Sequence, residues 1–192
     1  MRAAAFTREV AQAGVGVGRL ISYDPRWPEG FDPSFDGFLR SFLAPVLALP
    51  FYLVVASLFR GEDGGSASLW AAAVSHGVNA LAFPAVVGLL ARPFGFGGGY
   101  AGFIVIVNWA SLFLNMGAAA ASALIPLGDT GYRLFTVLWL WLFAASLFIT
   151  WRAARETLSS EIAPALLMVV LSVGIGVLSD QLSGWAFKLV GG

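Results

Sequence analysis

The sequence predicts an all-α integral membrane protein: a bundle of five transmembrane helices preceded by an interfacial amphipathic helix. Its composition is the first reason, because 58% of the 192 residues are apolar and only 11% are charged, against roughly 25% charged in a soluble domain. The second reason is the presence of five long stretches without a charge, and the third is a helical apolar pattern near the N-terminus.

The five spans follow from length, since a membrane helix needs about 20 mostly apolar residues. The glycine-rich run 93–100 predicts a loop and not a further helix. Asp180 is expected to interrupt the last span, so that 181–190, too short to cross again, would lie at the membrane surface. The predicted spans are 41–59, a segment within 64–91, a segment within 93–128, 134–151 and 162–179.

Residues 1–37 are expected to form a cytoplasmic segment, and residues 38–192 the five-span domain. Apolar residues of this segment recur at helical spacing, largely apart from its charged residues, which is typical of an interfacial helix. Gly14, Gly16 and Gly18 count against it, because each glycine costs a helix interior about 1 kcal/mol relative to alanine. The apolar positions are Phe6, Val10, Ala13, Val17, Leu20 and Ile21.

The start of the first membrane helix is predicted at Asp32 and Pro33. Aspartate is a favourable N-cap residue, and proline is favoured at the first helical position. Aromatic residues from Trp27 to Phe38 around this start suit the boundary between water and lipid.

Basic residues near the spans predict a cytoplasmic N-terminus under the positive-inside rule. Ten of the 11 basic residues are arginine, which favours a GC-rich bacterial genome and hence a bacterial inner membrane. Anionic lipid headgroups are natural neighbours of the arginines at the cytoplasmic ends of the spans, namely Arg92, Arg152 and Arg155.

Polar side chains inside a span must face protein or water, because hydrocarbon offers no hydrogen-bond partner. His76 and Asn79 are neighbours on one face of the second span. Asn108, Ser111 and Asn115 form a polar stripe on the third span. If the two faces meet, they enclose a small polar site. Alternatively, these groups hydrogen-bond across the helix pair and hold it together, a role that demands less and is therefore favoured.

An enzyme, a metal site and a nucleic-acid partner are not expected. The chain has no cysteine and one histidine, so the residue types for nucleophilic or metal chemistry are scarce. The 11 basic residues balance 11 acidic ones, so there is no basic field for nucleic acid. No cofactor is predicted.

The layout resembles the Yip family of membrane proteins. The similarity lies in a cytoplasmic N-terminal segment, a linker containing Asp24-Pro-Arg-Trp-Pro, five spans over 38–190 and a short external C-terminus. The resemblance implies a protein that works through contacts with other membrane components. The Asp-Leu-Tyr-Gly-Pro signature of eukaryotic members is absent, so no functional residue is carried over.

Two functions are therefore expected from the sequence. The first is a non-enzymatic membrane protein that contacts lipids and a protein partner or further copies of itself. The alternative is a small-solute transporter, or its substrate-binding subunit, with a polar site between spans two and three. A cavity lined by the five polar residues would favour transport, whereas direct contacts between them would favour the structural role.

Overall fold

The computed structural model describes residues 3–58, 66–91, 93–96, 98–159 and 161–190, and within these ranges it contains helices and no strand. The all-α class predicted from the sequence is confirmed. The elements are α1 (Ala3–Ile21), η1 (Trp27–Gly30), α2 (Phe35–Ser41), α3 (Leu43–Leu58), α4 (Ser66–Ala91), α5 (Tyr100–Ser122), η2 (Ile125–Leu127), α6 (Asp129–Thr157) and α7 (Ile162–Val190).

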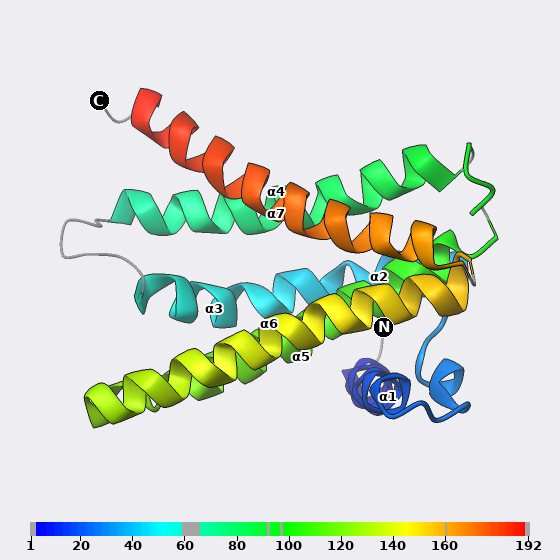
Figure 1. Cartoon of the computed structure of the whole chain (residues 1–192), viewed down its shortest axis with the longest axis horizontal. Helices are drawn as coiled ribbons and strands as arrows, with labels where there is room; N and C mark the ends of the chain where they lie inside the picture. Colours follow the sequence, from blue (N-terminus) through cyan, green and yellow to red (C-terminus); the bar gives the residue numbers. More distant parts are fainter. Residues whose placement is uncertain (1–2, 59–65, 92, 97, 160, 191–192) are drawn as a thin grey trace.

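Five stretches in the described part of the chain are long and apolar enough to cross a membrane, as predicted. They run side by side along the long axis of the molecule, with α1 at one end and the last turns of α7 at the other (Figure 1). The stretches are Phe35–Leu58, Leu69–Ala91, Tyr100–Leu127, Asp129–Thr157 and Ile162–Ser183.

The membrane-length helices close into a ring in the order α3, α4, α7, α6, α5, each packing against its two neighbours. The pairs α3 with α5 and α4 with α7 pack most extensively, whereas α4 meets α5 only over a short stretch across the ring. α5 is the most enclosed helix: 44% of its apolar window is buried, against 17–22% in the other four spans. Its side chains therefore form most of the interior.

The first span is two helices and not one. α2 begins at Phe35 with Ser34 as its N-cap, whose hydroxyl accepts a hydrogen bond from the Gly37 N–H at 3.1 Å. The predicted cap at Asp32 is wrong, because the Asp32 carboxylate is used elsewhere: it accepts from the Ser34 N–H and pairs with Arg40. α2 ends at Ser41 and α3 begins at Leu43, so Phe42 separates the two helices.

The last span is part of a longer helix. α7 continues as one helix from Ile162 to Val190, whereas its membrane-length stretch ends at Ser183, close to the predicted end at 179. A carboxylate is tolerated inside this helix because the Ser75 hydroxyl of α4 donates a hydrogen bond to it. Ser179 and Ser183 lie close to Asp180 in the sequence, one turn apart on α7, and both are buried.

The predicted amphipathic helix is present as α1, which runs crosswise to the bundle and is seen nearly end-on in Figure 1. Its apolar face is covered by protein: Ala13 and Leu20 are buried, and Phe6 lies against Trp109 of α5. The glycines expected to weaken this helix allow close approach, since a side chain on Gly16 would lie within 3.0 Å of the Gly30 Cα. Tertiary packing thus offsets their low helix propensity.

Gly99 offers a stability test with a built-in control. A methyl group there would overlap the Thr157 carbonyl oxygen at the junction of α5 and α6, while one on Gly98 would meet open space. We expect Gly99→Ala to lower the free energy of unfolding by about 1–3 kcal/mol through overpacking, and Gly98→Ala to change it little. Unfolding in detergent followed by circular dichroism measures both, and equal effects would contradict the described junction.

Candidate functional site

The polar residues predicted on the second and third spans line one cavity of about 260 Å³. α4 supplies His76 and Asn79, while α5 supplies Asn108, Ser111 and Asn115. The cavity lies where α4 and α5 face each other without packing closely, and α3 and α7 complete its wall with Pro45, Tyr52 and Ser172.

His76 is held at the cavity wall by two contacts with α3. Its Nε2 lies 2.9 Å from the Pro45 carbonyl oxygen, so that nitrogen carries the proton and donates. The imidazole ring lies 4.8 Å from the Tyr52 ring, centroid to centroid. These contacts fix the ring, and a neutral imidazole in this tautomer leaves Nδ1 as an acceptor.

Asn108 ties α5 to the break in the first span. Its Nδ2 donates to the Ser41 Oγ at 3.0 Å, and that hydroxyl donates in turn to the Phe38 carbonyl. Ser41 is fully buried as the last residue of α2, and Asn108 is 5% exposed. The sequence left open whether these polar residues hold helices together. Asn108 does so through this bond, but the bond joins α5 to α2 and not to α4.

The remaining polar groups of the cavity either form a hydrogen bond within their own helix or have no partner among the described residues. Ser111 donates to the Asn108 carbonyl and Asn115 Nδ2 donates to the Ser111 carbonyl, both within α5. In the described part of the chain, the Asn79 amide and the side-chain oxygens of Asn108 and Asn115 form no hydrogen bond. The cavity therefore presents both a donor and acceptors for a bound molecule.

Among the described residues, those that line the cavity include no lysine, arginine, aspartate or glutamate. A charged ligand would lose its hydration here without gaining a counter-charge, which is costly in a low-dielectric site. Amide, hydroxyl and imidazole groups suit a small uncharged molecule that carries hydrogen-bonding groups of its own.

A second cavity, of about 460 Å³, lies between α5, α6 and α7 and shares Val107, Ser111 and Ser172 with the first. Asp180 lines it, together with the hydroxyls of Ser146 and Thr150. Sequence reasoning missed this cavity because Asp180 was assigned to the end of a span. The signal that could have found it is the spacing of Ser172 and Asp180, two turns apart on one helix face.

No protein-family model, curated protein or solved structure matches this chain. Function is therefore inferred from the residues and their geometry. Among the described residues, no three histidine, aspartate or glutamate side chains are grouped so that they could hold a metal ion.

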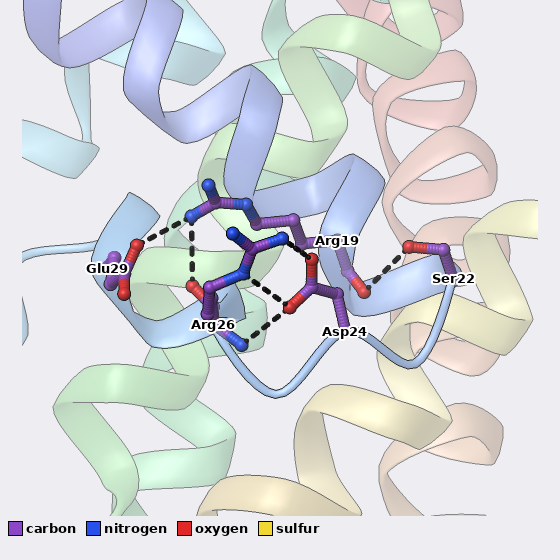
Figure 2. A network of polar contacts seen from close by, with 5 residues as sticks. All are labelled: Arg19, Ser22, Asp24, Arg26 and Glu29. Atoms are coloured by element: carbon purple, nitrogen blue, oxygen red, sulfur yellow. Dashed lines mark hydrogen bonds and ion pairs between the residues drawn. The ribbon is translucent and has the colours of Figure 1, made fainter.

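A network of ion pairs and hydrogen bonds links the end of α1 to η1 in the N-terminal segment (Figure 2). Arg19 pairs with Glu29 at 2.8 Å, and the Arg26 guanidinium binds both oxygens of Asp24. The hydrogen bonds from Arg26, side chain first, lower the pKa of Asp24 to about 2. Ser22 completes the network by donating to the Arg19 carbonyl. The turn after α1 is thereby held in one conformation.

A second clamp joins α1 to α2 next to the cavity. Arg40 pairs with Glu9 of α1 at 3.0 Å and with Asp32 at 2.6 Å. The neighbouring residue, Ser41, is the one that accepts from Asn108. Arg40, which attaches α1, is therefore adjacent in the chain to the residue that holds Asn108 of the cavity lining.

The arginines expected near lipid headgroups have different surroundings. Arg152 is used inside the protein: its guanidinium lies 3.4 Å from the Tyr23 ring centroid, pairs with Glu156, and its side chain is 9% exposed. Arg155 is half-buried over the Trp151 ring. Arg92 lies outside the described residues, and headgroup contact stays a prediction.

Replacing Asn108 and Asn115 separately distinguishes a structural amide from a free one. Asn108→Leu removes the bond to α2, so we expect a loss of about 0.6–1.7 kcal/mol, the range for such bonds in membrane bundles. Asn115→Leu removes only a bond within α5 and is expected to cost less. Unfolding free energies in bilayer-like micelles measure this difference, and the reverse order would contradict the Asn108 to Ser41 bond.

The clamp at Arg40 predicts a pH dependence. The hydrogen bond from Ser34 and the nearby Arg40 lower the pKa of Asp32. A lowered pKa stabilises the fold above the ordinary value of about 3.9, and this stabilisation is lost as the pH falls through the lowered value. We expect hydrogen-exchange protection factors of α1 amides to fall between neutral pH and about pH 3.

Arg40→Gln should lower these protection factors already at neutral pH and flatten their pH dependence. Arg8→Gln is the matched control, because Arg8 is on the exposed face of α1 and forms no ion pair with the described residues. An unchanged protection of α1 in Arg40→Gln would show that apolar packing alone holds the helix.

Proposed function

We propose that this protein binds a small uncharged solute with hydrogen-bonding groups in the cavity between α4 and α5, and carries it across a bilayer. The observation that supports this most directly is the cavity itself, with the Asn79 amide and two further amide oxygens unbonded among the described residues. Asn79 and Asn115 are half-buried, so their unbonded groups are accessible to a ligand or to water.

The arrangement speaks against a purely structural role for the five residues. In the described part of the chain, no hydrogen bond joins His76 or Asn79 of α4 to the polar stripe of α5. Side chains that held this helix pair together would bond across it. Here the two faces stand on opposite sides of a cavity instead.

Five spans are few for a complete alternating-access carrier, so the proposal includes a second copy or an energising partner. α6 offers a surface for it, since Val137, Leu140 and Trp141 are more than half exposed. The same exposed side chains suit lipid. The second candidate function is therefore the one expected from the Yip-like resemblance, in which the protein works through contacts with other membrane components.

The proposed location is a bacterial inner membrane that the chain crosses five times, with α1 on the cytoplasmic side. Arg40 contacts α1 through Glu9, and Arg152 contacts the turn after α1 through Tyr23. Arginines at the same end as α1 support this orientation under the positive-inside rule.

Swelling of proteoliposomes tests the carrier function. The full chain is reconstituted, and stopped-flow light scattering follows the entry of urea, acetamide, glycerol and erythritol. We expect at least one of these uncharged probes to enter faster than into protein-free liposomes. Asn79→Leu and Asn115→Leu should abolish the gain, because each replaces an amide of the cavity with an apolar group.

Met116→Leu is the matched control, since Met116 is exposed on α5 beside Asn115 and does not line the cavity. It should retain the wild-type rate. If no probe enters faster through correctly folded protein, the carrier proposal is overturned and the contact function is favoured.

A further inference from the structure

Asp180 is a carboxylate on α7, three residues before Ser183, where the membrane-length stretch of this helix ends. It is exposed in the structure and lines the cavity between α5, α6 and α7. The other described acidic residues of the membrane-length helices are Asp36, Asp129 and Glu156, and each lies in the first or last turn of its helix. An ionisable residue within a span is costly and therefore points to a function.

We propose that Asp180 is a proton-binding site that couples proton movement to solute transport. This inference rests on the proposed function, since it assigns the driving ion of the same carrier. The first support is the hydrogen bond from the Ser75 hydroxyl of α4 to the Asp180 carboxylate, made by a serine that is 3% exposed. The bond joins the two helices that pack most closely on that side of the ring.

The second support is the cavity of about 460 Å³ that Asp180 lines. Besides the Trp139 indole, its other polar side chains are hydroxyls, and each hydroxyl donates its hydrogen to a carbonyl of its own helix, which leaves the oxygen as an acceptor. A protonated Asp180 adds a donor beside these acceptors. The hydroxyls are those of Ser111, Ser146, Thr150 and Ser172.

The third support is the contact between the two cavities. Ser111 and Ser172 line both, so Asp180 and the solute-binding amides face a shared wall. A change of charge at Asp180 can therefore alter the packing of the helices that hold the solute. Coupling of this kind needs only a local change that both sites sense.

A proton fits this site better than a metal cation. Metal cations such as Ca²⁺ or Mg²⁺ need about six oxygen ligands, whereas the described side chains bonded at this point are one carboxylate and one hydroxyl. The cavity residues from α5 and α6 carry no titratable group, and His76, next to Ser75 on α4, lines the other cavity. The described residues that line this cavity therefore include no cation.

The step itself is a single proton transfer. A hydronium ion entering the cavity gives its proton to a carboxylate oxygen of Asp180, an O–H bond forms, and water leaves. The product is a neutral carboxylic acid, so position 180 no longer places a charge among the apolar residues of α7. Release of the proton to water on the other side restores the carboxylate.

Infrared difference spectroscopy of the full chain in liposomes tests proton binding without a solute. Lowering the pH should produce a carboxylic-acid carbonyl band that Asp180→Asn removes and that Asp129→Asn, a control at the exposed start of α6, retains.

The transport arm uses the same uncharged probes with an imposed proton gradient. An inward gradient should accelerate probe entry through the wild type and leave Asp180→Asn with only its gradient-independent rate. Absence of the Asp180 band, or acceleration by a sodium gradient in place of the proton gradient, would overturn the proton site. If the band is present but no probe enters through the wild type, proton binding holds and the carrier function fails.

Discussion

The structure depends on one constraint: a polar group placed in hydrocarbon must find its partner within the protein. Each polar side chain of the membrane-length helices meets this demand differently. Asn108 uses Ser41, His76 uses the Pro45 carbonyl, and Ser75 and Asp180 use each other. These few bonds decide where helices may touch and where space is left between them.

The five spans could be predicted from sequence because hydrophobic length is a local property. The break at Phe42 could not, because it depends on contacts made by residues far along the chain. Asp32 has the pattern of a helix cap, yet Arg40 competes for its carboxylate, and Ser34 takes the capping position. At Asp32, the ion pair with Arg40 thus overrides the local preference of aspartate for a helix cap.

The candidate site was predictable in part for the same reason. Helical spacing placed His76 with Asn79 and aligned Asn108, Ser111 and Asn115, because residues three or four apart share a helix face. Whether those faces would touch or enclose space depended on the order of helices around the ring, which spacing does not encode. The partner of Asp180 could not be predicted, because Ser75 lies 105 residues earlier in the chain.

The order of helices in the ring has a consequence for biosynthesis. α4 is made before its main packing partner, α7. Until α7 is made, Ser75 lacks its carboxylate partner and one side of α4 is uncovered. The ring, and with it both cavities, can therefore form only after α7 has joined the other four helices.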